Sequence, residues 1–104
     1  MNSVFKALAV PTRRHVLELL RTRPMSAGEL SDQFPLSKPT MSAHFAVLRE
    51  ADLIEMHKAG TTITYHLKLS VLEDALLGFA AVFRLGAQAE PADEVSPIPT
   101  PDKG

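Results

Sequence analysis

The feature that most constrains the fold of this chain is a change in the spacing of its apolar residues. Up to about residue 51 they recur every three or four positions, as on one face of an amphipathic helix. Between Ile54 and Leu67 they alternate with polar residues, which predicts a half-buried β-hairpin turning at Lys58–Thr61, with Gly60 in a positive-φ conformation. After Ser70 the helical spacing returns. The residues predicted to face inward on the hairpin are Ile54, Met56, Ile63, Tyr65 and Leu67.

Prolines divide the first half of the chain into predicted helices. Pro11 follows a short helix over residues 2–10 and opens a second one, at a position where its missing N–H costs nothing. Pro24 ends that second helix, and Pro35 ends a third that begins near Ser26 and reaches Phe34. The first half is therefore built from short helices joined by tight connections.

Serines mark where two of these helices begin. Ser26 and Glu29 form a capping-box pattern for the third helix. Ser37 is the predicted N-cap of a fourth helix that has Pro39 in its first turn and runs to about Ala51. The residues predicted to turn this fourth helix toward the core are Met41, Phe45 and Leu48.

A last helix is predicted from a second capping box, Ser70 with Glu73, to about Ala87. It is apolar on nearly every side, and a small domain cannot cover such a helix alone. A second copy of the chain is the simplest cover, so we expect a homodimer. The alternative is a central core helix of a monomer.

The composition limits the classes of function. The 104 residues fit one domain over residues 1–88, followed by a Pro-rich acidic tail over 89–104 that we expect to be disordered or extended. With no cysteine there is no thiolate metal site, cysteine nucleophile or disulfide. No signal peptide, membrane span, phosphate loop or nucleophile–base pairing is visible, so we expect a cytoplasmic protein that is not an enzyme and needs no cofactor.

The order of the elements predicts a winged helix-turn-helix fold: four helices, a two-stranded wing and a last helix. Pro35-Leu36 is a tight connection between the third and fourth helices. In this motif the N-terminal residues of the second helix lie at the bases of the major groove. Net charge is −1, but residues 1–70 hold nine Lys/Arg against six Asp/Glu, which favours DNA only weakly. The candidate base-facing residues are Ser37, Lys38, Pro39, Thr40, Ser42 and Ala43.

Several runs of residues resemble the ArsR-type winged-helix repressors, and within them the SdpR-like autorepressor branch. They are VFKALAVPTRRHVLELL, SAGEL, LSKPTMSAHFAVLREADLI and KAGTTITYHL, and together they cover roughly residues 2–85. The resemblance implies a homodimer built from the first and last helices that binds an inverted repeat in double-stranded operator DNA. The implied dimer residues are Val4, Phe5, Leu8, Leu72, Leu76, Phe79, Val82 and Phe83.

Departures from the family pattern modify these expectations. Val10 replaces the usual aspartate before the second helix, and Ala43 and Thr61 stand where many members carry a charged DNA contact. We therefore expect moderate DNA affinity. The alternative is a winged-helix protein-interaction module whose DNA binding is weakened or lost. The family's arsenic-type and zinc-type metal ligands are missing, so we expect no metal sensing, and a protein or a small molecule remains the candidate inducer.

For each remaining candidate contact the sequence leaves two interpretations open. Arg13 and Arg14 could bind phosphates or form ion pairs with Glu18 or Asp32. His44 could be oriented at the edge of the core or could touch a phosphate. For Lys38, Lys58, Thr40 and Ser42 the alternative to a DNA contact is an ordinary solvated side chain.

Overall fold

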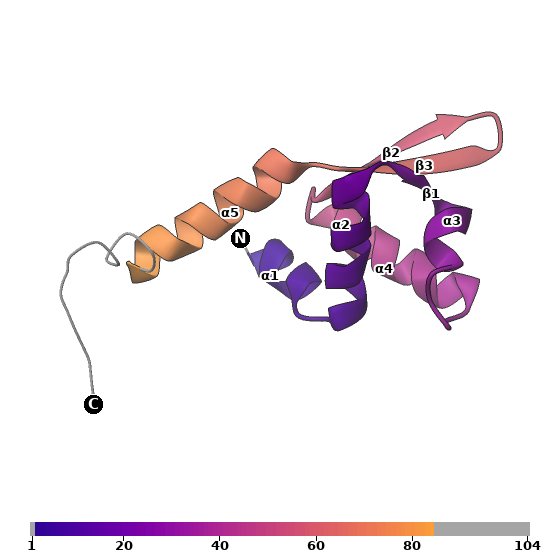
Figure 1. The fold of residues 1–104 in the computed structure, drawn as a ribbon. Helices are drawn as coiled ribbons and strands as arrows, with labels where there is room; N and C mark the ends of the chain where they lie inside the picture. The colour runs from indigo at the N-terminus through magenta and orange to yellow at the C-terminus, as the bar shows by residue number, and fades with distance from the viewer. Residues whose placement is uncertain (1, 85–104) are drawn as a thin grey trace. The chain divides into compact units, whose positions relative to one another are not determined.

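The computed structural model describes residues 2–84, which are mainly α-helical (Figure 1). The described chain divides into two units after Leu72. The predicted tail, residues 89–104, and the predicted domain boundary at residue 88 lie outside the described residues. The elements are α1 (Asn2–Leu8), α2 (Pro11–Thr22), β1 (Met25–Ser26), α3 (Ala27–Ser31), α4 (Lys38–Glu50), β2 (Ile54–Ala59), β3 (Thr62–Leu67) and α5 (Leu69–Phe83).

The first two helices meet at a sharp connection. α1 ends at Leu8, two residues before its predicted end, and α2 begins at Pro11 as predicted. Val10 occupies the N-cap position in an extended conformation, with φ −106° and ψ 125°, and its side chain makes no capping hydrogen bond. The predicted absence of a side-chain cap on α2 is therefore confirmed.

α3 is shorter than predicted. Its capping box is confirmed, because the Glu29 amide donates to Ser26 Oγ and the Ser26 amide donates to Glu29 Oε1, both at 3.0 Å. The prediction that the helix reaches Phe34 is wrong, because it ends at Ser31. The Phe34 amide donates three residues back to the Ser31 carbonyl, as in a tight turn. The Phe34 ring meets the His15 ring of α2 edge-on, with centroids 5.1 Å apart.

α4 agrees with the prediction at both ends and in its buried stripe. Ser37 is the N-cap and Ala51 the C-cap. Met41, Phe45 and Leu48 are all buried. The chain then leaves the helix through Asp52, which has a positive φ of 61° and whose carboxylate receives a hydrogen bond from Lys68 Nζ at 2.8 Å.

The predicted hairpin is confirmed, with β2 and β3 antiparallel and Gly60 at φ 61°. The sheet also has a third strand that was not predicted. β1 pairs with β3, Met25 opposite Tyr65 and Ser26 opposite Thr64, so the strand order is β1-β3-β2. Two residues are too few to show a periodicity, so the sequence pattern does not reveal this strand.

In the wing, which we define as the β2–β3 hairpin, β3 is half-buried or buried from Ile63 to Leu67, whereas β2 is mostly exposed. Ile54 and Tyr65 are buried as predicted. Met56, one register step further out, is 36% exposed, so its prediction as an inward-facing residue is wrong. From Glu55 to Ala59 every β2 residue is exposed.

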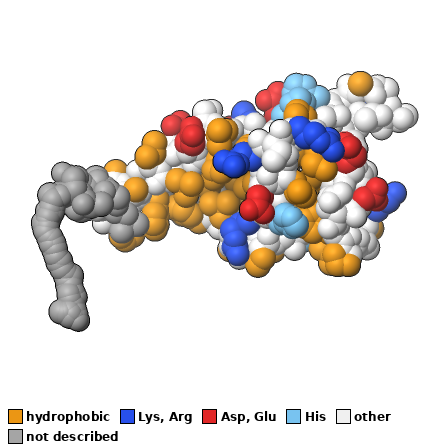
Figure 2. Space-filling model, in the orientation of Figure 1, with side chains coloured by type: hydrophobic (Ala, Val, Ile, Leu, Met, Phe, Trp, Pro, Cys, Tyr) orange, Lys and Arg blue, Asp and Glu red, His pale blue; other side chains and the backbone are white. Residues whose placement is uncertain are grey.

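α5 begins at Leu69, so the prediction that Ser70 caps it is wrong, and Ser70 lies in its first turn. The Val71 amide donates to the Lys68 carbonyl, and the helix begins two residues earlier than the capping-box pattern indicated. The helix ends at Phe83, and the predicted end at Ala87 lies outside the described residues. None of its residues is buried, and hydrophobic side chains gather along it in Figure 2.

The core of the first unit lies where α1, α2 and α4 pack against one another and against the sheet. The buried residues extend from Val4 in α1 to Ile54 and Tyr65 in the hairpin. Over residues 2–84 no helix is long and apolar enough to cross a membrane. The buried hydrophobic residues are Val4, Ala7, Val16, Leu17, Leu20, Met25, Leu30, Met41, Phe45, Leu48, Ala51, Leu53, Ile54 and Tyr65.

Candidate nucleic-acid interface

The N-terminal half of α4 presents small polar side chains to solvent. Ser37 Oγ accepts from the Thr40 amide at 3.3 Å and donates to Thr40 Oγ1 at 2.8 Å, which fixes the first turn. The opposite side of the helix is anchored in the core by the stripe that begins at Met41. A rigid helix thus holds exposed hydroxyl groups and one cation in fixed positions. The exposed residues are Ser37, Lys38, Pro39, Thr40, Ser42 and Ala43, all six of the predicted base-facing residues.

A hollow of about 190 Å³ lies between α3 and this face of α4. Gly28 and Ser31 line it from α3, and Lys38 and Ser42 line it from α4. The described residues of α3 beside it carry no bulky exposed side chain, so the polar face of α4 stays accessible from this side.

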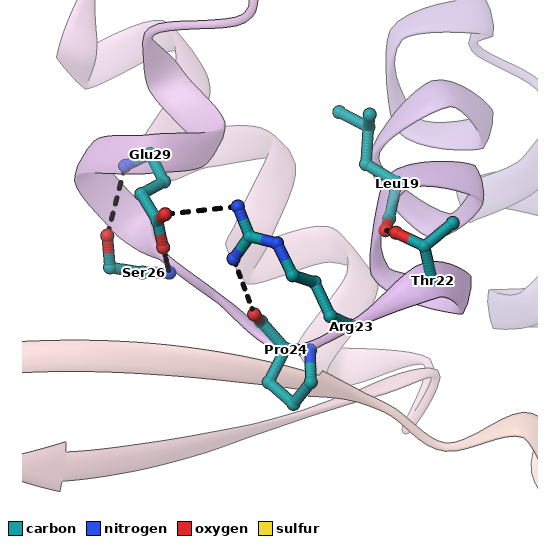
Figure 3. A network of polar contacts seen from close by, with 6 residues as sticks. All are labelled: Leu19, Thr22, Arg23, Pro24, Ser26 and Glu29. Atoms are coloured by element: carbon teal, nitrogen blue, oxygen red, sulfur yellow. Dashed lines mark hydrogen bonds and ion pairs between the residues drawn. The ribbon is translucent and has the colours of Figure 1, made fainter.

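The position of α3 is set by a polar network at its first turn (Figure 3). The Arg23 guanidinium donates to Glu29 Oε2 and to the Pro24 carbonyl, both at 3.2 Å. The hydrogen bond from the Ser26 amide, followed by the contact with Arg23, lowers the pKa of the Glu29 carboxyl. This network ties the end of α2 to the start of α3, the first helix of the helix-turn-helix.

Arg13 has a different environment from the one predicted. It is only 9% exposed. Its Nε donates to the Ala7 carbonyl at 2.9 Å and its Nη2 to the Lys6 carbonyl at 2.8 Å, so the guanidinium closes the C-terminal end of α1. Neither predicted alternative, a phosphate contact or a surface ion pair, describes this buried side chain.

Arg14 is exposed and donates to the Leu8 carbonyl at 2.7 Å, so it also helps to close α1. An exposed guanidinium retains free donors, and its phosphate contact stays a prediction. His44 is half-buried, and its Nδ1 lies 3.4 Å from Arg13 Nη1. Burial, followed by the nearby positive charge of Arg13, lowers the pKa of His44.

The tip of the wing carries Lys58 and Thr61, both exposed, on either side of Gly60. Closer to the base, His57 Nε2 pairs with Glu55 Oε2 at 2.8 Å, and the His57 and His66 rings lie 4.2 Å apart. This ring pair was not predicted. The strand register could have indicated it, because His57 lies opposite Thr64, two residues from His66. A DNA contact by the wing tip remains a prediction.

The predicted dimer residues differ in their exposure. Val4 is 6% exposed and belongs to the core, because α1 packs against both α2 and α4, so the structure corrects its assignment to a dimer surface. Phe5, Leu8, Leu72 and Phe79 are half-buried. The most accessible apolar side chains of α5 are Leu76 at 46%, Leu77 at 68%, Val82 at 72% and Phe83 at 61%.

Among residues 2–84 no group of three or more His, Asp or Glu side chains is placed to hold a metal ion. Glu29 is engaged in the capping box of α3, and Glu73 and Asp74 are adjacent on α5.

The comparisons with known proteins agree with this geometry. A family model described as a helix-turn-helix domain matches residues 8–57. The transcriptional repressor SdpR of Bacillus subtilis (strain 168) is 43% identical over 76 residues, which are 73% of this chain and 84% of that protein. The arsenical resistance operon repressor of Staphylococcus aureus is 29% identical over 76 residues, 73% of each chain.

Solved structures place the fold in the same group. A crystal structure of an ArsR family transcriptional regulator matches with a TM-score of 0.74 and 31% sequence identity, over 81% of this chain and 92% of that one. The resemblance stated from the sequence is thereby confirmed, and so is the winged helix-turn-helix fold predicted from the order of the elements. The matching proteins are transcriptional regulators, which agrees with the expectation that the chain is not an enzyme. The chain belongs to the ArsR-type family of winged helix-turn-helix transcriptional regulators, which bind DNA.

Proposed function

We propose that this chain is a homodimeric repressor of its own or a neighbouring operon that reads an inverted repeat with α4 and does not sense metals. The observation that carries the proposal is the two-sided construction of α4. Its inward stripe is buried, while its N-terminal polar residues are exposed on a capped first turn. The Lys38 ammonium suits a phosphate, and the hydroxyls of Thr40 and Ser42 suit base edges.

Dimerisation is proposed from α5. A helix with this many exposed apolar side chains needs a partner surface, and two-fold symmetry lets one copy supply the same surface to another. A symmetric dimer would present two copies of α4 to half-sites about one helical turn apart. Because its ligand is DNA, we propose that the protein acts in the cytoplasm. Because metals are not the proposed signal, we propose a protein or a small molecule as the inducer.

Lys38→Ala is expected to weaken operator binding and to reduce its dependence on salt. Each phosphate contact contributes about 0.9 to the slope of log K against log salt, so losing one contact per protomer should lower the dimer's slope by roughly 1.8. Fluorescence anisotropy with promoter DNA at several salt concentrations measures this slope. Arg21→Ala is the matched control. Arg21 is exposed on α2, so its replacement removes the same charge at a position outside α4.

An unchanged slope for Lys38→Ala would show that this lysine is an ordinary solvated side chain. If wild-type protein shows no preference for its own promoter over random DNA, the repressor proposal fails. The protein-interaction alternative would gain support if the double variant Lys38→Ala/Thr40→Ala still regulated its target in cells.

Zinc and arsenite are expected to leave operator affinity within about twofold, against the roughly 5–150-fold typical of allosteric coupling. The chain has no cysteine, and residues 2–84 hold no group of three metal-ligating side chains. The measurement is an anisotropy titration with each ion added, with a chelator-treated sample as the control. A fall in affinity of fivefold or more would contradict the proposal that metals are not the signal.

A further inference from the structure

The side chain of Arg13 joins three helices. Its guanidinium comes from α2, donates to the Lys6 and Ala7 carbonyls at the end of α1, and reaches His44 Nδ1 in α4. The side chain is almost fully buried, so water does not replace these partners. The helix that carries the proposed DNA-reading residues is thus connected, through one side chain, to the first helix of the chain.

The chemistry of this contact requires a neutral imidazole. A guanidinium has only donors and stays protonated in proteins. His44 Nδ1 must therefore offer a lone pair, which places the single ring proton of His44 on Nε2. A protonated imidazolium has no acceptor and would bring a second positive charge within 3.4 Å of the first.

We propose that Arg13 is a positioning residue for the recognition helix α4. Through neutral His44 it holds α4 against α1 and α2, and protonation of His44 releases this contact and weakens DNA binding. The inference rests on the proposed function only in its DNA-binding readout. It also gives His44 a role opposite to a phosphate contact, in which the protonated ring would strengthen DNA binding.

The surrounding charges favour the neutral ring. Burial, followed by the positive charge of Arg13, lowers the pKa of His44. In the described chain Arg13 forms no ion pair with a carboxylate. The charged or titratable side chains on the elements packed against α4 are Lys6 on α1, Arg13, Arg14, His15, Glu18 and Arg21 on α2, and Glu55, His57 and Lys58 on β2.

The direction of the pH effect follows from the lowered pKa of His44. Because burial and Arg13 favour the neutral ring in the folded chain, the contact is complete above the ordinary pKa of 6.5. It is lost as the pH falls below 6.5 and through the lowered pKa of the folded state. Weakly acidic conditions are therefore where the recognition helix should lose this support.

The test compares wild type with His44→Asn from about pH 7.5 to about pH 5.5, the range in which an imidazole titrates. The asparagine carbonyl can accept from Arg13 but cannot take up a proton in this range. The ratio of wild-type to variant operator affinity cancels the effects of the other histidines. We expect this ratio to fall by about tenfold for each unit that separates the pKa values of His44 in the free and DNA-bound protein.

Arg13→Met provides the second half of the test, because methionine has neither the positive charge nor the N–H donors of arginine. If both residues act through one contact, the pH-dependent ratio should vanish in Arg13→Met/His44→Asn compared with Arg13→Met alone, so the two effects are not additive. A constant ratio for the wild-type pair, or one that rises on acidification, would overturn the inference and make His44 a phosphate contact or a bystander.

A second measurement does not depend on DNA or on a variant that folds. Nitrogen NMR of the wild-type imidazole should show His44 with a bare Nδ1 and a protonated Nε2 at about pH 7.5. A proton on Nδ1 would refute the contact directly. If the tautomer is as expected but no operator preference is found, the proposed function fails while the Arg13–His44 contact stands.

Discussion

Replacing Leu76 by glutamate is expected to convert the proposed dimer into monomers and to lower operator affinity by about 100-fold or more. Leu76 is 46% exposed in the middle of the apolar helix α5. A carboxylate there would have to be buried without a partner if two copies packed on this surface, which costs several kcal/mol. A monomer would then bind one half-site and lose the gain of binding both.

Light scattering after size-exclusion chromatography and an anisotropy titration give the two readouts for Leu76→Glu. Ser70→Glu is the matched control, because it adds the same charge to an exposed position in the first turn of the same helix, where a negative charge is tolerated. A Leu76→Glu protein that stays dimeric would rule out this face of α5 as the interface. A wild-type monomer at micromolar concentration would rule out the dimer itself.

Phe45→Ala is expected to destabilise the fold by about 3–5 kcal/mol, a large part of the 5–15 kcal/mol that holds a typical domain folded. Phe45 is 3% exposed, and its ring contacts the Tyr65 ring with centroids 4.9 Å apart. Truncation would leave a cavity where α4 meets the sheet. DNA binding should be lost at temperatures at which the variant unfolds.

Urea unfolding followed by circular dichroism, at one fixed protein concentration, measures the effect of Phe45→Ala. Ala46→Ser is the matched control on the neighbouring exposed position of α4 and should change stability by no more than about 0.5 kcal/mol. An equally stable Phe45→Ala protein would mean that α4 is not anchored by this ring and would undermine the rigid-helix basis of the proposed interface.

The parts of the fold that the sequence predicted well depend on local chemistry. Ser37 and Pro11 act on the residues next to them, and the register of the wing follows from the turn at Gly60. The solvent-exposed side of α4 follows from the spacing of Met41 and its neighbours. Caps, turns and periodicities can therefore be recognised without knowing the rest of the structure.

The parts that were missed depend on tertiary contacts. Arg13 looked like a surface cation because its acceptors are backbone carbonyls, which every residue has and no sequence pattern marks. Val4 was assigned to the dimer surface because the resemblance implied a dimer built from the first helix, but the structure buries it where α1 packs against α2 and α4. The start of α5 was misplaced because the carbonyl of Lys68 begins the helix before the Ser70–Glu73 pattern does.

The two sides of α4 also have a consequence for how such regulators diverge. The residues that fold the helix and the residues available to read DNA do not overlap: Met41 and Phe45 are buried, whereas Ser42 and Ala43 are exposed. Under the proposed function, substitutions at Ser42 and Ala43 would change operator preference at little cost in folding stability. A duplicated copy of this gene can therefore acquire a new set of target promoters in a few mutational steps, while the scaffold stays under independent selection.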